Sequence, residues 1–267
     1  MTSIEVASGH DAKGTYDAFA PFYDDFTAHH DYDLWLGSIL PELERCGLRG
    51  DRLLDVGCGT GKSFIPMLDR GWNVTACDIS AEMVAIARAK VGSGVRFEIA
   101  DMRALPVFGE FDLVWSLDDA VNYLLDGGAL RHALRGMGAN LALGGLLFFD
   151  LNTLSSYRSF FAETEQRTMS DGRRILWRGR ADADAAPGSI CEAEYELDGE
   201  HAGPPHRQRH FPPDEVEGAL VAAELELLDV FGHGFDTVLE QPVDEDRHSK
   251  MVFIARRAGR ADEGRVR

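Results

Sequence analysis

Short, mostly apolar runs alternate with segments of helical hydrophobic spacing along most of the chain. Seven such runs predict buried strands: residues 52–57, 73–78, 95–100, 111–116, 146–151, 225–231 and 250–256. Helices are predicted between them at residues 62–70, 81–91, 130–143 and 214–224. Gly144 and Gly145 are expected to end the third helix before the next strand, and Asp214 to cap the fourth. Alternating strands and helices, with nearly continuous apolar strands, are typical of an α/β doubly wound, mostly parallel sheet, here of seven strands.

Two segments depart from this alternation and predict additions to the sheet. Residues 15–47 carry aromatic side chains at roughly helical spacing and predict two amphipathic helices, separated near His29 and His30. Residues 155–211 contain alternating stretches typical of antiparallel strands, with a turn at residues 185–188 and several Pro and Gly breaks. This second segment predicts an antiparallel β lid inserted into the sheet domain.

We therefore expect five parts along the chain. They are an N-terminal helical cap, a Rossmann-like core, the lid, a return helix with the last two strands of the core, and a disordered tail: residues 1–50, 51–153, 154–212, 213–257 and 258–267. The tail has no apolar pattern, so it offers nothing to bury against the core.

The charge of the chain limits the partners it can bind. Asp and Glu outnumber Lys and Arg by 45 to 27, which gives a formal net charge of −18 and a pI near 4.8. Such an average charge repels a polyanion, and no dense basic patch offsets it along the sequence. We expect no nucleic-acid partner.

The apolar runs and the cysteine spacing also limit the class of protein. The N-terminus has no apolar signal region and no apolar run approaches the length that crosses a bilayer, so no membrane partner is expected. The cysteines lack C-x-x-C spacing and a paired histidine cluster, which predicts neither a metal site nor a disulfide framework. These patterns predict a cytoplasmic protein with reduced cysteines.

The candidate chemistry begins in the glycine-rich loop Asp55-Val-Gly-Cys-Gly-Thr-Gly61, after the first predicted strand. Glycines let the backbone turn tightly and come close to a ligand at the carboxyl edge of a parallel sheet. A triphosphate-binding loop ending at Lys62 would need glycine at position 56, which is Val56, so that class is excluded. The dinucleotide fingerprint would need its third glycine at position 62, which is Lys62. This mismatch argues against an NAD-dependent enzyme, but that hypothesis stays open.

Acidic residues at the ends of the next two predicted strands complete a pattern. Asp78 can accept hydrogen bonds from two ribose hydroxyls, and Asp101 can accept one from an adenine amino group. The motifs Leu54-Asp-Val-Gly-Cys-Gly-Thr-Gly61, Asp78-Ile-Ser80 and Asp101-Met102 resemble those of class I S-adenosylmethionine-dependent methyltransferases. The resemblance covers about residues 15–152 and 213–257 and implies the Rossmann-like fold of that family.

The resemblance also implies S-adenosylmethionine as the cofactor and S-adenosylhomocysteine as the product. In the family the residue matching Asp55 helps to orient the cofactor ammonium group, and those matching Asp78 and Asp101 hold ribose and adenine. The cofactor-binding residues implied in this chain are Tyr23, Asp55, Gly57, Cys58, Gly59, Gly61, Asp78, Ile79, Asp101, Met102 and Leu117.

The segment Tyr16-Asp-Ala-Phe-Ala-Pro-Phe-Tyr-Asp24 resembles the aromatic N-terminal helix of glycine/sarcosine and amino-sugar N-methyltransferases. In those enzymes the helix closes over the cofactor and a tyrosine often lies near the sulfonium, which makes Tyr16 a candidate catalytic residue. Aromatic faces attract such a cation. The Asn-Pro-Pro-Tyr signature of enzymes that methylate DNA bases or protein glutamine is absent after residue 116.

Polar residues after the fourth and fifth strands and in the lid are candidates for the acceptor site. Three could take a proton from the acceptor: Asp118, Asp119 and His210. Four more could bind it: Asn122, Tyr123, Asn152 and Arg209. We predict a methyltransferase that acts on a small molecule, with an amine nitrogen as the preferred acceptor. O- or C-methylation in natural-product biosynthesis and a non-catalytic cofactor-binding protein are the alternatives, and a homodimer is compatible with each.

Overall fold

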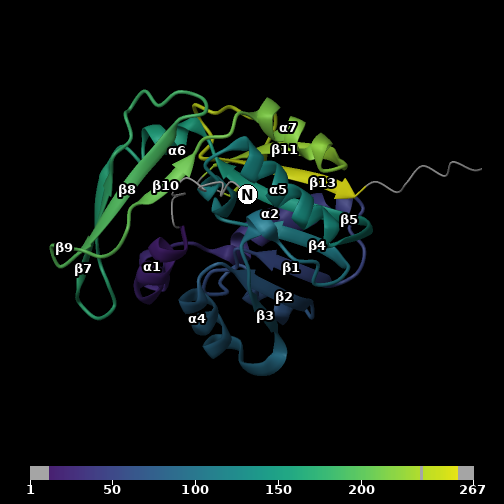
Figure 1. The fold of residues 1–267 in the computed structure, drawn as a ribbon, viewed down its shortest axis with the longest axis horizontal. Helices are drawn as coiled ribbons and strands as arrows, with labels where there is room; N and C mark the ends of the chain where they lie inside the picture. Colours follow the sequence, from purple (N-terminus) through teal and green to yellow (C-terminus); the bar gives the residue numbers. More distant parts are fainter. Residues whose placement is uncertain (1–11, 235–236, 258–267) are drawn as a thin grey trace, which may run out of the picture.

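The computed structural model describes residues 12–234 and 237–257 of the chain. Within these residues, an eight-stranded sheet forms the centre of the molecule (Figure 1). Its strands in chain order are β1 (Arg52–Val56), β2 (Asn73–Asp78), β3 (Arg96–Ile99), β4 (Phe111–Ser116), β5 (Leu141–Asn152), β11 (Leu225–His233), β12 (Leu239–Glu240) and β13 (Lys250–Arg257). Across the sheet they follow the order β12-β11-β13-β5-β4-β1-β2-β3.

The pairing of these strands confirms the predicted fold class. β1 to β5 pair with one another in parallel. β13 runs antiparallel to both β5 and β11, so its first residue, Lys250, lies at the edge where the parallel strands end. The eighth strand, β12, is two residues long and pairs with the outer side of β11. It was not predicted, because two residues are too few to show an alternating pattern.

Helices cover both faces of the sheet because apolar residues of the central strands point alternately to either side. Val114 of β4 belongs to the apolar cluster that contains α5 (Gly127–Ala139) and α7 (Pro213–Ala222). Its neighbour Trp115 belongs to the cluster on the other face. That cluster contains α2 (Tyr32–Arg45), α3 (Ile65–Asp69) and α4 (Ala81–Val91). Short 3-10 helices follow α4, β3 and β4: η1 (Gly92–Gly94), η2 (Met102–Ala104) and η3 (Ala120–Tyr123).

The predicted boundary between the third helix and the fifth strand is wrong. α5 ends at Ala139 rather than at residue 143, because the buried Asn140 caps it. The Asn140 amide nitrogen donates to the carbonyls of Gly136 and Pro106, at 2.9 Å each. β5 therefore begins at Leu141, and Gly144, with φ +79°, lies inside the strand where its pairing with β4 shifts register.

Three helix starts differ from the prediction. α5 begins at Gly127 rather than at residue 130. Residues 62–64 form turns, so α3 begins only at Ile65. α7 begins at Pro213, with Pro212 as its N-cap, and Asp214 lies in the first turn instead of at the cap. Proline suits the first helical position because the N–H that it lacks would have no partner within the helix.

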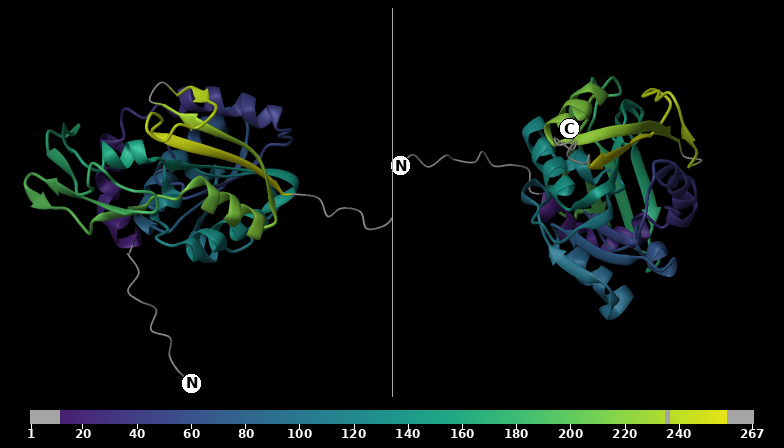
Figure 2. Two further views of the ribbon diagram at one scale, coloured as in Figure 1. Left: turned by 90° about the horizontal axis from the view of Figure 1, so that it is seen from above. Right: turned by 90° about the vertical axis from the view of Figure 1, so that its right-hand side faces the viewer.

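The predicted lid is an antiparallel sheet separate from the central one (Figure 2). Its strands are β6 (Thr164–Thr168), β7 (Arg174–Gly179), β8 (Ile190–Leu197), β9 (Glu200–His201) and β10 (His206–Arg209). The order is β10-β8-β7-β6, with β9 paired to β8. The short helix α6 (Leu154–Arg158) leads from β5 into this sheet. On β8 the buried residues Cys191, Ala193 and Tyr195 alternate with more exposed ones, as one covered face requires.

Two N-terminal helices separated near His29 and His30 are confirmed, but they pack on different layers. α1 (Ala12–Phe26) packs its Phe19 and Phe26 in an apolar cluster with lid residues. α2, which Asp31 caps by accepting a hydrogen bond from the Leu34 N–H, packs on the central sheet. α1 therefore lies where the lid and the central sheet meet (Figure 1).

Two predicted segments fall outside the described residues: the start of the helical cap at residues 1–11 and the tail at residues 258–267. Within the part of the chain that is described, none of the helices combines the length and apolar character needed to cross a membrane.

Candidate active site

A cavity of about 80 Å³ lies at the carboxyl ends of β1, β2, β3 and β4. Eight of the eleven residues expected to bind the cofactor line it: Tyr23, Gly57, Gly59, Asp78, Ile79, Asp101, Met102 and Leu117. Tyr16 and Asp118 line it as well. The sequence motifs at the ends of three strands therefore meet in one place.

The glycine loop and Asp78 form one wall of this cavity. Gly57 has φ +81°, and a Cβ atom there would lie 3.0 Å from the Ala120 Cβ, so a larger residue would crowd this wall. The buried Asp78 carboxylate accepts hydrogen bonds from the backbone N–H groups of Gly59 and Ser80, at 2.8 Å each. Burial raises its pKa, which the backbone hydrogen bonds partly oppose. Each carboxylate oxygen keeps a lone pair that a hydroxyl donor can use.

Asp101 forms another wall, at the end of β3. Its carboxylate caps η2 by accepting from the Arg103 N–H at 2.9 Å, and it also pairs with the Arg103 guanidinium. Partial burial acts to raise its pKa, but Arg103 holds that pKa below the ordinary value. Asp101 is therefore an ionised hydrogen-bond acceptor beside Met102.

Three expected cofactor residues, Asp55, Cys58 and Gly61, do not line the cavity. Asp55 is fully buried, and its Oδ2 accepts a hydrogen bond from the Ser63 hydroxyl at 2.6 Å. Burial raises the pKa of Asp55 to about 7. A Cβ on Gly61 would lie 2.9 Å from the Phe64 ring. These residues lie in the loop but outside the cavity lining, so a contact with the cofactor stays a prediction for them.

A larger cavity of about 360 Å³ adjoins the first. Tyr16, Tyr23, Asp118 and Tyr123 line both cavities and form the wall between them. Ten of the described residues that line the larger cavity are aromatic: Tyr16, Phe19, Tyr23, Phe26, Tyr32, Trp35, Tyr123, Phe160, Phe161 and Trp177. Four of them come from one face of α1, at the helical spacing that the sequence showed.

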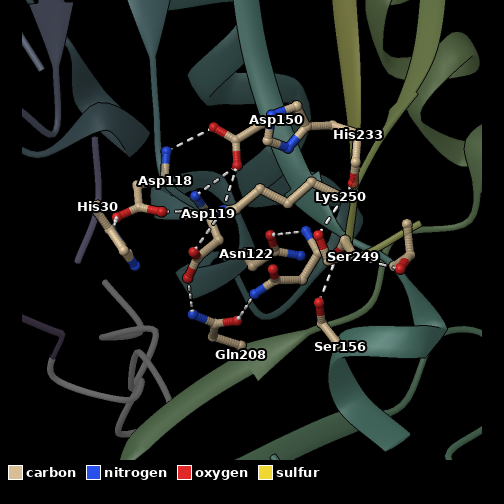
Figure 3. Close-up of polar contacts among 12 residues, drawn as sticks. His30, Asp118, Asp119, Asn122, Asp150, Ser156, Gln208, His233, Ser249 and Lys250 are labelled. Carbon is tan, nitrogen blue, oxygen red and sulfur yellow. Dashed lines mark hydrogen bonds and ion pairs between the residues drawn. The ribbon is translucent and has the colours of Figure 1, made fainter. Parts of the chain in front are cut away.

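A largely buried lysine, Lys250, lies at the polar end of this cavity (Figure 3). The Lys250 ammonium forms ion pairs with three carboxylates: Asp118 at 3.2 Å, Asp119 at 2.9 Å and Asp150 at 2.7 Å. We call these four residues the Lys250 cluster. The three carboxylates raise the Lys250 pKa well above its ordinary value, although burial opposes them. No motif or spacing along the chain had singled out Lys250.

Asp150 binds the backbone N–H groups of Asp118 and Asp119. Its two carboxylate oxygens accept from the N–H groups of Asp118 at 2.6 Å and Asp119 at 2.9 Å. Asp118 and Asp119 have φ values of +60° and +56°, a left-handed conformation that is unfavourable for residues other than glycine. The hydrogen bonds to Asp150 stabilise this turn and direct both side chains to the cavity.

The two aspartates differ in their ionisation. Burial acts to raise the pKa of Asp118, but Lys250 and His30 hold it well below the ordinary value. Burial raises the pKa of Asp119 to about 6, and the neighbouring carboxylates add to this effect while Lys250 opposes it. Asp118 is therefore a permanent anion, whereas Asp119 can gain a proton in mildly acidic solution.

An amide network links Asp119 to the lid. Gln208 of β10 donates from Nε2 to the Asp119 carboxylate, and its Oε1 accepts from the Asn152 side chain at 2.9 Å. Asn152 and Gln208 line the larger cavity. Asn122 does not; its side chain bridges the Asn152 N–H and the Arg209 carbonyl. Asn122 is fully buried, so its position favours a supporting role over the expected acceptor contact.

The structure does not bring Arg209 or His210 to either cavity. Arg209 forms two hydrogen bonds to the Glu215 carboxylate, at 2.9 Å each. His210 is fully buried, with Nε2 2.5 Å from Glu245 Oε2. Because alternate residues of a strand face opposite sides, β10 presents His206 and Gln208 to the cavity instead. The alternation of the lid sequence could have indicated this pair.

Tyr123 connects the lid to the wall between the cavities. Its hydroxyl lies 2.6 Å from His206 Nδ1, and its ring centroid lies 5.0 Å from that of Tyr16. The predicted residues that the structure brings together are therefore Tyr16, Tyr23, Asp118, Asp119, Tyr123 and Asn152. Within residues 12–234 and 237–257, no group of three or more His, Cys, Asp or Glu side chains is arranged to hold a metal ion.

A Rossmann-like sheet with a glycine loop after β1 and carboxylates after β2 and β3 defines the class I methyltransferase architecture. Residues 53–145 match the family described as "Methyltransferase domain". The chain is 32% identical over 167 residues to a protein of Geobacillus sp. (strain WCH70) whose name describes it as a methyltransferase, covering 61% of this chain and 68% of that protein.

Two further matches extend over more of the chain. The Bacillus subtilis protein YqeM, also named as a methyltransferase, is 29% identical over 228 residues, which cover 83% of this chain and 91% of YqeM. The structure of the sugar N-methyltransferase KedS8 from Streptoalloteichus sp. superposes with a TM-score of 0.70 at 23% identity, covering 97% of this chain and 99% of KedS8. The chain belongs to the class I S-adenosylmethionine-dependent methyltransferases. It is therefore an enzyme that uses S-adenosylmethionine, and the NAD-dependent and non-catalytic alternatives are set aside.

Proposed function

We propose that this methyltransferase acts on a small molecule in the larger cavity, and that the preferred acceptor atom is an amine nitrogen. One observation carries the proposal: Tyr16, Tyr23, Asp118 and Tyr123 separate a cofactor cavity from an aromatic cavity of about 360 Å³. That volume suits a drug-sized or smaller ligand and is too small for a folded macromolecule. A homodimer stays a prediction.

The residues around the smaller cavity fit S-adenosylmethionine. Asp78 would accept from the ribose hydroxyls, Asp101 would accept from the adenine amino group, and Met102 would pack on the adenine ring. Gly57 and Gly59 leave room for the methionine part, because a Cβ on Gly57 would close this wall against Ala120. When bound, S-adenosylmethionine supplies a methyl group carried on a sulfonium cation.

The charge of the larger cavity favours an amine. The Lys250 cluster combines three carboxylates with one ammonium, so it is anionic whenever Asp119 is ionised. An amine enters such a site as an ammonium ion, which the carboxylates and the aromatic faces both attract. KedS8, a structural relative by fold, is named as a sugar N-methyltransferase, which agrees with this preference. O- or C-methylation is the alternative to be tested.

Positioning of the acceptor beside the methyl group and exclusion of water would supply most of the rate enhancement. Methyl transfer is an in-line displacement, so the acceptor must be held close to the methyl carbon and away from solvent. Tyr16 and Tyr123 in the shared wall would align the two reactants. The lid and α1 would exclude water, since their aromatic residues pack together over the cavity.

A paired acceptor panel tests the proposal. The purified protein would be given S-adenosylmethionine with amino sugars and aromatic amines, and with hydroxyl analogues of the same shape. We expect methylated amines and release of S-adenosylhomocysteine, at a kcat/KM at least about tenfold above the hydroxyl analogues, since one charge-assisted hydrogen bond contributes about 1.5–3 kcal/mol. Methylation of the hydroxyl compounds alone would support the alternative, and methylation of only tRNA or protein would overturn the small-molecule assignment.

A matched pair of variants locates the acceptor. Asp119→Asn should raise KM for an amine about tenfold or more, because it removes a carboxylate that lines only the larger cavity. Asp214→Asn, on the exposed surface of α7, should leave both KM and kcat unchanged. Equal KM values in the two variants would remove Asp119 from the acceptor site.

A further inference from the structure

His30 lies in the loop between α1 and α2 and lines the larger cavity (Figure 3). Its Nδ1 is 3.1 Å from Oδ2 of Asp118, and Asp118 belongs to the wall shared by the two cavities. The His30 side chain is 34% exposed, so part of the ring is accessible while Nδ1 contacts Asp118. The His30 imidazole thus contacts a residue of the wall at which the two reactants would meet.

The carboxylate beside His30 is fixed in place. Asp118 Oδ2 also accepts a hydrogen bond from the Tyr32 hydroxyl at 3.2 Å, and Oδ1 pairs with Lys250 at 3.2 Å. Its backbone N–H donates to Asp150. Since Asp118 is ionised and already paired on both oxygens, it is a poor proton acceptor, but it can orient a donor on the imidazole.

We propose that His30 is the base that takes the proton of the methyl acceptor at Nε2, with Asp118 as the positioning residue that holds the Nδ1–H. The inference rests on the proposed function, because it concerns the proton of an acceptor in the larger cavity. A histidine with one ring nitrogen donating to a carboxylate presents the other as an acceptor. Neither His30 nor this pairing is evident from the sequence pattern, since 88 positions separate the two residues.

An ammonium acceptor must lose one proton before its nitrogen can form a bond to the methyl carbon. The N–H proton moves to His30 Nε2, and its electron pair becomes the nitrogen lone pair. That lone pair forms the new bond to the methyl carbon, while the electrons of the broken carbon–sulfur bond remain on sulfur. The imidazolium that results is stabilised by Asp118, and proton loss to solvent through the exposed edge of the ring resets the site.

The other charged groups around His30 favour this assignment over one to its neighbour. The His29 ring centroid lies 4.3 Å from that of His30, and His29 Nδ1 is 2.7 Å from the Arg167 guanidinium. Burial, His30 and Arg167 together lower the His29 pKa to about 4, so His29 stays neutral. Asp31, Asp119, Glu165 and Lys250 also line this cavity, and Lys250 faces His30 across Asp118. Of these two neighbouring histidines, His30 is therefore the one whose imidazole pairs with a carboxylate.

The tautomer of His30 tests the arrangement without any turnover. In ¹⁵N-histidine-labelled protein, NMR should show neutral His30 with its proton on Nδ1, and Asp118→Asn should change that tautomer distribution. A proton on Nε2 in the wild-type protein would overturn the proposal, because Nε2 could then not accept another.

Kinetics separate this inference from the proposed function. His30→Asn keeps a donor near Asp118 but has no acceptor at the Nε2 position, so kcat for an amine should fall about 10²-fold or more. The Kd for S-adenosylmethionine should stay within about twofold, and added imidazole should partly restore the rate of His30→Ala. His132→Asn, on the exposed face of α5, is the matched control and should behave as wild type.

The kinetic outcomes distinguish a failure of the His30 inference from a failure of the proposed function. If the wild type methylates an amine and His30→Asn retains its kcat, the inference is wrong and the proposed function stands. If only hydroxyl compounds are methylated but His30→Asn loses kcat and imidazole rescues His30→Ala, the amine preference is wrong and His30 remains the base.

Discussion

Lys250, the first residue of β13, places its ammonium 2.7 Å from the carboxylate of Asp150, near the end of β5. The pairing follows from topology: β13 runs antiparallel to β5, so the start of one strand meets the end of the other. Asp150 also accepts the N–H groups of Asp118 and Asp119, which connects the last strand to the proposed acceptor site.

Lys250→Met should destabilise the fold by about 3–5 kcal/mol, because it leaves the buried Asp150 carboxylate without its counterion. Urea unfolding at neutral pH measures this free energy. Lys90→Met is the matched control: Lys90 pairs with Asp24 at a partly exposed position, where an ion pair contributes about 0–1 kcal/mol. Equal losses in the two variants would show that the Lys250 cluster does not stabilise the site.

Asp78→Ala should weaken S-adenosylmethionine binding by at least about tenfold. The change removes a carboxylate that lines the cofactor cavity and that holds the Gly59 N–H, and a charge-assisted hydrogen bond contributes about 1.5–3 kcal/mol. Isothermal calorimetry with the cofactor measures the change. Asp69→Ala, exposed at the end of α3, should bind as the wild type does. An unchanged Kd in Asp78→Ala would contradict the proposed ribose contact.

Asp55 should make stability depend on pH in the cofactor-free protein. Burial raises its pKa to about 7, above the ordinary value of 3.8, so the folded state holds this proton more tightly than the unfolded state. The stability that it contributes is fully present below about pH 4 and is lost as the pH rises through about 7.

Comparison with Asp55→Asn isolates this effect. The unfolding free energy of the wild type, relative to that of the variant, should fall by roughly 2–4 kcal/mol between about pH 4 and about pH 8, since one pKa unit corresponds to about 1.4 kcal/mol. Urea titrations across this range measure the difference, and a constant difference would contradict the prediction.

His210→Gln should affect stability and not acceptor binding. The imidazole is fully buried between the Gly188 N–H and the Glu245 carboxylate, so its loss leaves unsatisfied polar groups and should cost about 1–3 kcal/mol. KM and kcat should stay within about twofold of the wild type. His132→Gln, on the exposed side of α5, should change neither quantity. A large rise in KM for His210→Gln would restore the role expected from the sequence.

Local patterns accounted for the cofactor side of the site. Gly57, Asp78 and Asp101 follow successive strands of a parallel sheet, and the ends of such strands lie at the same edge, so their order in sequence already brings them together. The aromatic spacing likewise predicted the helix α1, and the structure shows that four of its aromatic residues line the larger cavity. The helix boundaries that failed were decided by buried side-chain contacts, such as those of Asn140 with Pro106 and Gly136.

The sequence by itself determined the class of fold, the cofactor loop and the position of the lid, because apolar periodicity and glycine spacing are properties of neighbouring residues. Only the tertiary structure decided which polar groups line the larger cavity. Lys250 reaches Asp118 across 132 positions because β13 turns back along β5, and β10 presents Gln208 while directing Arg209 away. Such contacts depend on strand direction and register, and these are set by how the layers pack together and not by any local pattern.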